Sequence, residues 1–357
     1  MEGIMKAQLF YGPGDIRLEF IDIPKIGPGE ALVKIKSALT CGSDLKTYKR
    51  GHPTMIEEGS VFGHEWAGDI VEIGDEVTDY KPGNRVAAMN SAPCFMCYYC
   101  KHELYSLCEN LVYNNGAYAE YIRIPANILK INTLKIPDSL TYKEAALTEP
   151  LACVVHGADV SNITEGDTVV VNGAGPIGLF WVALAKLKGA RVISTDLSDE
   201  RLGIASEFGA DFTINATKVE DQVEAVKSLT EGSRGADVAV DATGFPNVWE
   251  MALRMGRKGA TINLFGGCPA GTSVNIETKL IHYSELKIIG TYHHTPYYVR
   301  KAFKLIENKQ INTAKFITAD MPLEKLVDAL ELMGKQKGIK YNILIQDDNM
   351  VIGGNIY

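Results

Sequence analysis

One stretch constrains the fold of this chain more than any other: residues 168–196, with the sequence TVVVNGAGPIGLFWVALAKLKGARVISTD. It opens with a short β-branched run, which is typical of a strand buried on both faces of a parallel sheet. Gly173, Gly175 and Gly178 follow in the pattern G-x-G-x-x-G, and an apolar helical segment then runs from Ile177 to about Lys188. The stretch therefore predicts a strand, a tight turn, a helix and a second strand.

The glycine pattern indicates a phosphate-binding turn. One glycine permits the sharp turn, one lets the backbone approach a pyrophosphate, and one lets the helix pack closely on the strand. The second strand ends at Asp196, 18 residues after Gly178, where a carboxylate can accept hydrogen bonds from an adenosine ribose. An acid at this position repels a 2′-phosphate, so the sequence predicts NAD rather than NADP. An ordinary glycine turn is the alternative, but the flanking strand, helix and acid favour a dinucleotide.

Strands and helices continue to alternate after Asp196, which predicts a parallel, doubly wound sheet. Ligands bind at the carboxyl ends of the strands in such sheets, so the turns there should face the nicotinamide half of the cofactor. Arg201 is expected along the adenine, and a solvated arginine at a helix start is the alternative. The predicted cofactor-binding residues are Gly173, Gly175, Pro176, Ile177, Gly178, Asp196, Arg201, Thr243, Leu264, Phe265 and Gly266.

The first third of the chain has a different character. Residues 6–38 contain short strand-like runs separated by turns rich in glycine and proline, which predicts a β-rich, barrel-like domain. Cys41 and Ser43 follow the last run, and His64-Glu65 comes about 23 residues after Cys41. A cysteine with such a pair can hold zinc through sulfur, nitrogen and oxygen while a position stays open for water or substrate. A buried cysteine and a capping histidine would explain these residues separately.

Four cysteines lie close together further along the chain. Their spacing is C-x2-C-x2-C-x7-C, formed by Cys94, Cys97, Cys100 and Cys108. Four thiolates satisfy a tetrahedral zinc completely, so this zinc is expected to hold a loop and to perform no chemistry. An iron–sulfur cluster and redox cysteines are the alternatives, and the clustered fourth thiol argues against a simple redox pair.

Length and charge limit the classes of protein. A chain of 357 residues is long for one core and suits two domains. Its net charge of -8 argues against nucleic acid or an anionic membrane surface as a partner. We find neither a run of about 20 apolar residues nor a basic N-terminal segment followed by an apolar core, and we therefore expect a cytoplasmic location.

Taken in order, these motifs and Glu149-Pro150-Leu151 make the chain resemble the zinc-dependent medium-chain dehydrogenase/reductase superfamily over nearly its full length. The resemblance is strongest to the polyol branch (sorbitol/L-iditol 2-dehydrogenase-like) and to L-threonine 3-dehydrogenase. It implies an α/β fold with a GroES-like β-rich catalytic domain at residues 1–153, including a structural-zinc lobe at about 90–110. A Rossmann NAD-binding domain would occupy 154–291, and 292–357 would return to the catalytic domain.

The resemblance also implies residue roles. Cys41 and His64 match catalytic zinc ligands, and the third ligand is Glu65, Glu149 or Cys153, of which we favour a carboxylate. Ser43 and His52 match a proton relay that leads out of the site. Residues expected to line the substrate pocket are Tyr48, His293 and His294.

The implied activity is NAD-linked oxidation of a secondary hydroxyl in a polyol, sugar or sugar acid, using two zinc ions per chain. The expected partner is a small hydroxylated molecule, and the expected assembly is a homodimer or homotetramer. One alternative is a dehydrogenase of simple alcohols, short diols or threonine. An alternative of another class is a non-catalytic NAD-binding or zinc-stabilised regulatory protein.

Overall fold

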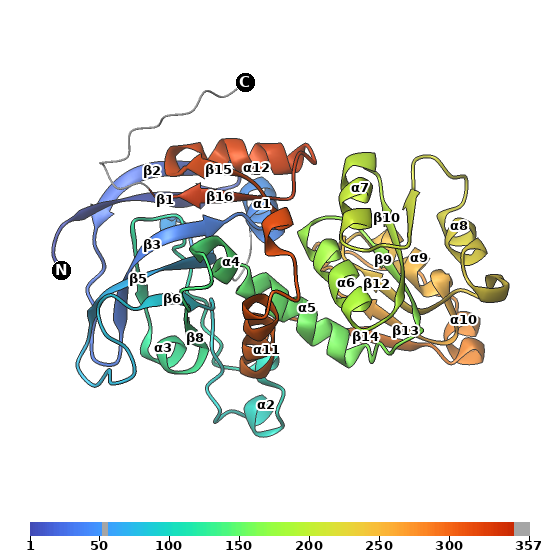
Figure 1. Ribbon diagram of the computed structural model, residues 1–357, viewed down its shortest axis with the longest axis horizontal. Coiled ribbons are helices and arrows are strands. Elements are labelled where there is room, and N and C mark those ends of the chain that lie inside the picture. Colours follow the sequence, from blue (N-terminus) through green and yellow to red (C-terminus); the bar gives the residue numbers. More distant parts are fainter. Residues whose placement is uncertain (52–55, 346–357) are drawn as a thin grey trace. The chain divides into compact units, whose positions relative to one another are not determined.

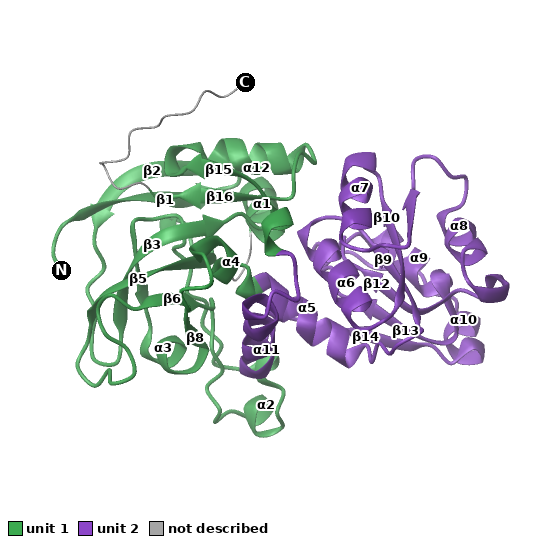
Figure 2. Cartoon of the chain, viewed as in Figure 1, with its two compact units in different colours: residues 1–149, 313–357 green, residues 150–312 purple. Residues whose placement is uncertain are grey.

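The structure is a computed structural model that describes residues 1–51 and 56–345. It contains two compact units, Met1–Glu149 with Thr313–Tyr357, and Pro150–Asn312 (Figure 2). Helix α11 (Pro296–Glu307) belongs to the second unit, where it packs on helix α5 (Thr148–Val160). Lys301 Nζ lies 2.5 Å from Asp159 Oδ2, and the Tyr298 ring stacks on His156 with centroids 4.6 Å apart.

The first unit is built on two sheets of mainly antiparallel strands (Figure 1). The smaller has the order β2-β1-β4 and the larger the order β15-β16-β3-β5-β6-β8, with β7 paired to β3. Strand bounds are β1 Ile4–Gly12, β2 Asp15–Asp22, β3 Ala31–Leu39, β4 Ser60–Val61, β5 Glu65–Ile73, β6 Arg85–Ala88, β7 Tyr121–Ile124, β8 Thr133–Lys135, β15 Ile317–Pro322 and β16 Lys340–Leu344. The predicted β-rich character of residues 6–38 is confirmed.

The chain returns to this unit after the second one. Strand β16 pairs antiparallel with β3, so that Asn342 lies opposite Leu39 and Ile343 opposite Ala38. Helix α12 covers part of the apolar core with Leu326, Ala329 and Leu330, all of which are fully buried. Helices in this unit are α1 Gly42–Arg50, α2 Tyr98–Lys101, α3 Ala126–Asn132, α4 Tyr142–Ala146 and α12 Leu326–Gly334.

The second unit has a six-stranded parallel sheet in the order β11-β10-β9-β12-β13-β14. Its strands are β9 Thr168–Asn172, β10 Arg191–Asp196, β11 Phe212–Asn215, β12 Ala236–Asp241, β13 Gly256–Leu264 and β14 Lys287–Gly290. The remaining helices are α6 Pro176–Leu187, α7 Asp199–Glu207, α8 Gln222–Ser228, α9 Pro246–Met255 and α10 Thr278–Ser284. The order has its switch between β9 and β12, as in doubly wound sheets, and the predicted α/β fold class is confirmed.

Strand β9 occupies the centre of this sheet, between β10 and β12. Val169, Val170 and Val171 are fully buried, which explains why the run is apolar at every position rather than at alternate ones. Helix α6 begins directly after the glycine turn, with Gly175 as its N-cap and Pro176 in its first turn. Among the residues that the structure describes, no helix is both long enough and apolar enough to cross a membrane.

Candidate active site

Strand pairing in the first unit brings Cys41 beside His64 and Glu65. Strand β3 ends at Leu39, which lies opposite Glu65 at the start of β5. Cys41 follows as the N-cap of α1, and its backbone N–H donates to Asp44 Oδ2 over 3.0 Å. One atom from each of Cys41, His64 and Glu65 lies within 4.8 Å of the others. A cysteine sulfur, an imidazole nitrogen and a carboxylate oxygen at such separations are a donor set suited to zinc.

The His64 ring is oriented by a buried carboxylate. Its Nδ1 lies 3.1 Å from Asp44 Oδ1, and the Tyr118 hydroxyl donates to Asp44 Oδ2 over 2.6 Å. Nε2 therefore faces the other side, where Ser43 Oγ lies 3.4 Å away. Burial alone would lower the pKa of His64, but the Asp44 carboxylate and the Cys41 thiol together outweigh burial and raise it. A carboxylate behind a histidine is the usual support for a metal-binding imidazole.

Within the described part of the chain, Glu65 has a hydrogen-bond partner on one of its two oxygens. Its side chain is completely buried, and Oε2 lies 2.5 Å from the ammonium of Lys340, which is also buried. Oε1 has no hydrogen-bond partner among the described residues. An unpartnered carboxylate oxygen is costly to bury, so this atom fits a site that holds a cation.

The Cys41 thiol is half-buried and easily ionised. Burial raises its pKa, but the hydrogen bond and charge of His64 and the charge of Lys340 more than compensate, and the pKa falls to about 7. A thiol with this pKa is partly thiolate near neutrality, which is the form that binds metal.

Glu149, Cys153 and Tyr48 are not members of the group formed by Cys41, His64 and Glu65. Glu149 is buried, and burial raises its pKa to about 7 although the charge of His64 lowers it. Cys153 lies on α5 in the second unit, and Tyr48 lies on α1, partly buried against the core of the first unit.

The remaining proposed site residues lie outside this group. His52 is outside the described residues. His293 and His294 follow β14 in the second unit, with ring centroids 4.0 Å apart. The carbonyl oxygen of His293 lies 2.8 Å from His156 Nδ1, and the His293 backbone is left-handed, with φ 61°.

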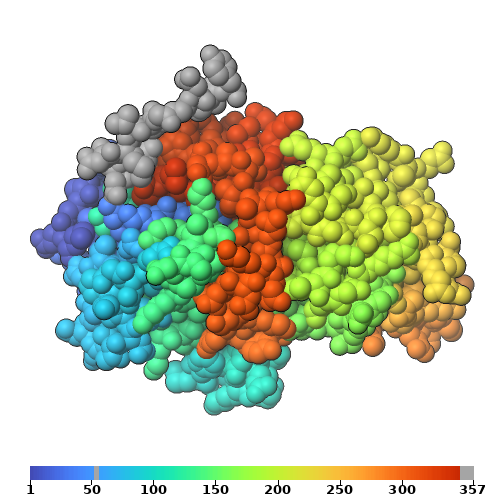
Figure 3. Space-filling view, in the orientation of Figure 1, coloured from blue at the N-terminus to red at the C-terminus, as the bar shows by residue number. Residues whose placement is uncertain are grey.

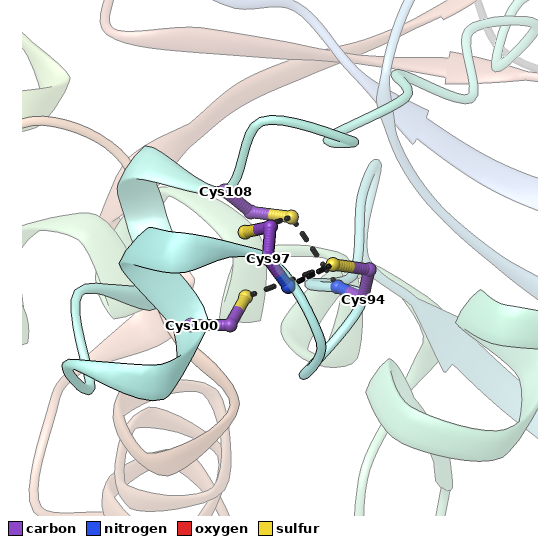
Figure 4. A group of neighbouring side chains, drawn as sticks. All are labelled: Cys94, Cys97, Cys100 and Cys108. Carbon is purple, nitrogen blue, oxygen red and sulfur yellow. Dashed lines mark hydrogen bonds between the residues drawn. The ribbon is translucent and has the colours of Figure 1, made fainter.

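The four cysteines form a second cluster in the first unit. Their sulfurs point toward one another from α2 and the loops beside it (Figure 4). Cys94 Sγ lies 4.0 Å from Cys100 Sγ, and Cys97 Sγ lies 3.9 Å from Cys108 Sγ. This segment, turquoise in Figure 3, lies at the surface of the molecule.

The electrostatics of this cluster favour a cation. The backbone N–H groups of Met96 and Cys97 donate to Cys94 Sγ over 3.4 Å and 3.3 Å. The Asn110 side chain and these N–H groups lower the pKa of Cys94 to about 6, whereas burial raises that of Cys100 to about 12. Four thiolates so close together require a positive ion to remain ionised, and zinc meets that requirement.

In the second unit, the glycine turn between β9 and α6 depends on the absence of side chains. A Cβ on Gly178 would lie 1.7 Å from the Gly173 carbonyl oxygen. Asp196 Oδ2 accepts the Ala174 N–H over 2.7 Å, which ties the end of β10 to the turn. Arg201 points toward the same turn: its Nη1 lies 3.9 Å from the position of a Cβ on Gly175.

The turns at the ends of β12 and β13 are held together by Asp241, which the sequence analysis did not single out. Its carboxylate accepts from the Thr243 hydroxyl over 2.6 Å and from the Gly244 N–H over 2.9 Å. Trp249 Nε1 donates both to this carboxylate and to the Gly266 carbonyl, over 3.0 and 3.1 Å. Leu264 ends β13, and Phe265 packs edge-on against Trp181.

Comparison with known proteins agrees with this geometry. Residues 27–138 match the model of the alcohol dehydrogenase GroES-like domain, and residues 176–308 match that of the zinc-binding dehydrogenases. The chain is 33% identical to sorbitol dehydrogenase from Bacillus subtilis, over 92% of this chain and 93% of that protein. It is 35% identical to L-threonine 3-dehydrogenase from Symbiobacterium thermophilum, over 94% and 95% of the two chains.

A solved structure extends the comparison to three dimensions. A putative zinc-binding dehydrogenase from Sinorhizobium meliloti 1021, bound to NADP, superposes with a TM-score of 0.89 and 30% identity, covering 96% of this chain and all of the other. Fold and site together define a zinc-dependent, dinucleotide-binding oxidoreductase that acts on CH–OH groups. The chain belongs to the zinc-dependent medium-chain dehydrogenase/reductase superfamily, as the sequence motifs predicted.

Proposed function

We propose that this protein oxidises a secondary hydroxyl of a polyol, sugar or sugar acid and transfers the hydride to NAD. The observation that carries the proposal is the donor set of Cys41, His64 and Glu65, in which Glu65 Oε1 is buried without a partner among the described residues. Similarity to sorbitol dehydrogenase over nearly the full length supports a polyol over a simple alcohol.

We assign the catalytic zinc to Cys41 Sγ, His64 Nε2 and Glu65 Oε1, with the fourth position left for substrate. Glu149 is then a buried carboxylate near the site, and Cys153 is an ordinary helix residue. Zinc in this position would act as a Lewis acid that makes a substrate hydroxyl easier to deprotonate, while the nicotinamide accepts the hydride. The four cysteines Cys94, Cys97, Cys100 and Cys108 would hold a structural zinc.

The protein side chains then position the substrate and move its proton. Asp44 holds the Nδ1 proton of His64, so Nε2 keeps its lone pair for the metal. Ser43 Oγ, 3.4 Å from Nε2, is placed to accept the hydroxyl proton and pass it on. In our proposal His52 receives it last, because an imidazole titrates near neutrality. Tyr48, His293 and His294 remain the proposed substrate-contacting residues.

For the cofactor we propose NAD, bound by the glycine turn, Asp196, Arg201 and the turns around Thr243 and Gly266. One Asp196 oxygen already accepts backbone N–H groups from Leu197 and Ser198, so the carboxylate is fixed at the end of β10. A fixed negative charge there disfavours a 2′-phosphate. The related Sinorhizobium structure contains NADP, so both cofactors belong in the test.

We further propose that residues 1–153 and 292–357 act as the catalytic domain and 154–291 as the dinucleotide domain. A cytoplasmic location is proposed because four adjacent reduced thiols suit a reducing compartment. A homodimer or homotetramer is proposed as the assembly.

A second candidate is a dehydrogenase of threonine or short diols, favoured by the 35% identity to L-threonine 3-dehydrogenase. The test is NAD- and NADP-linked oxidation of sorbitol, xylitol, inositols, aldonates, 2,3-butanediol, threonine and ethanol. The proposal predicts NADH formation with a polyol or sugar acid. Turnover of threonine alone would select the second candidate. A protein that binds NADH, holds one zinc per chain and turns over no substrate would favour the non-catalytic alternative.

A further inference from the structure

A buried lysine from the C-terminal return lies against the site. Lys340 is the first residue of β16, and 1% of its side chain is exposed. Its ammonium donates to Glu65 Oε2 over 2.5 Å and to the Thr40 carbonyl oxygen over 2.7 Å. Buried ammonium groups are tolerated only where they are paired and hydrogen-bonded, and both conditions hold here.

Lys340 binds one of the two carboxylate oxygens of Glu65. The ammonium takes Oε2, and Oε1 is left with no partner among the described residues. The group that contains Glu65 also contains Cys41 and His64, so the unpartnered oxygen belongs to the carboxylate that completes the donor set. A lysine present only to neutralise Glu65 would not explain why, among the described residues, the second oxygen meets no donor.

Lys340 also acts on the backbone beside Cys41. The Thr40 carbonyl oxygen accepts a hydrogen bond from the ammonium. The Thr40 hydroxyl accepts the Tyr341 N–H over 2.9 Å, and the Thr40 N–H donates to the Tyr341 carbonyl oxygen over 3.0 Å. The start of β16 thus fixes the residue that precedes one proposed ligand and the carboxylate of another. The site is therefore complete only after the C-terminal return has paired with β3.

We propose that Lys340 is a positioning residue that makes Glu65 bind the catalytic metal through Oε1 alone. Holding Oε2 prevents the carboxylate from taking two coordination positions, so one position stays open for the substrate hydroxyl. This inference rests on the proposed function, because it requires a metal at Cys41, His64 and Glu65.

The test measures the metal site rather than turnover alone. Lys340→Met removes the ammonium while retaining an unbranched chain, and Lys340→Arg retains the charge. The control is Lys143→Met, which breaks another lysine–carboxylate pair of the same unit, with Asp320 at 2.6 Å. Each zinc-loaded protein is titrated with a chelator while zinc per chain is counted, and the visible spectrum of the cobalt(II)-substituted form reports ligand number and geometry.

We expect Lys340→Met to lower zinc affinity at this site by about 10- to 100-fold, as for other partners of metal ligands, and to change the cobalt spectrum. Lys340→Arg should lie closer to the parent, and Lys143→Met should match it. If Lys340→Met does not fold, Lys340→Gln replaces it with the same expectations.

Two results would overturn the inference, and they differ in meaning. Parent-like affinity and spectrum in Lys340→Met, with both changed in Glu65→Gln, would leave the proposed function intact and reduce Lys340 to a counter-ion. Zinc held by the four cysteines alone in the parent would remove the metal site and with it the proposed function.

Discussion

Gly178→Ala is the sharpest test of the glycine turn at Gly173, Gly175 and Gly178. A Cβ at this position would lie 1.7 Å from the Gly173 carbonyl oxygen and 2.8 Å from its carbon, both of which are backbone atoms. Ordinary van der Waals contact begins near 3.4 Å, so α6 and the turn must separate by about 1.7 Å. Inserting atoms into a packed site costs about 1–3 kcal/mol, which corresponds to roughly 5- to 150-fold weaker binding if the turn carries the strain.

The assay is a fluorescence titration with NADH, together with urea unfolding. Gly203→Ala is the matched control, because a Cβ there has no atom within 4 Å and the residue lies inside α7. It should leave NADH affinity unchanged and stabilise the fold by up to about 1 kcal/mol, since alanine is the better helix former. NADH affinity in Gly178→Ala equal to that of the parent would refute the close approach of helix and strand.

Three further predictions concern other parts of the molecule. Tyr118→Phe removes a donor from the buried Asp44, so urea unfolding should show a loss of about 1.5–3 kcal/mol; an unchanged midpoint would contradict this. Burial lowers the pKa of His156 in the folded protein below its value in the unfolded chain. Below about pH 6.5 the unfolded state therefore binds more protons than the folded state. The free energy of unfolding of the parent should fall as the pH is lowered from about 7 to 5. The free energy of unfolding of His156→Asn should fall less over that pH range. If it falls as much in the variant as in the parent, His156 is not the cause of the pH dependence. Cys100→Ser should remove the structural zinc and expose the lobe to protease, whereas an unchanged metal content would exclude Cys100 as a ligand.

Features encoded in short stretches were predictable from the sequence. The glycine turn and the four cysteines each lie within a few residues of one another, so spacing alone determines what they can bind. A Thr and a Glu three residues apart are another local signal of this kind, since Thr141 and Glu144 form a capping box at the start of α4, with the Glu144 N–H donating to the Thr141 hydroxyl over 3.3 Å. The expected return of the last segment to the first unit is seen in β16, where Asn342 and Ile343 pair with β3.

Contacts between distant residues were not predictable. Lys340 and Glu65 are 275 residues apart, and Tyr118 and Asp44 are 74 apart. The first pair depends on the register by which β16 and β5 both lie beside β3, and the second joins a residue outside the strands to helix α1, so no single segment encodes either pair. A charged residue at the start of the last strand, Lys340–Leu344, was the available signal for Lys340, and it has meaning only once the strand is placed beside β3.

Secondary structure is also hard to predict where the residues have a weak preference for helix or strand. Helix α1 follows Cys41 directly, and its start at Gly42-Ser43 has poor helix formers, so Asp44, which accepts the Cys41 N–H, is its clearest signal. Within residues 113–124, strand β7 covers Tyr121–Ile124, and Ala119 forms an isolated bridge to Ala7. Residues 272–276, which are β-branched in part, form no strand within this chain.

The most direct test of the account is zinc content and NADH formation measured on the same preparations, for the parent and for Cys41→Ala. The account predicts two zinc ions per parent chain, one in the variant, and polyol-dependent NADH formation that disappears on metal removal and returns with zinc. Polyol oxidation that persists in Cys41→Ala, or in the parent after the metal at this site is removed, would contradict it.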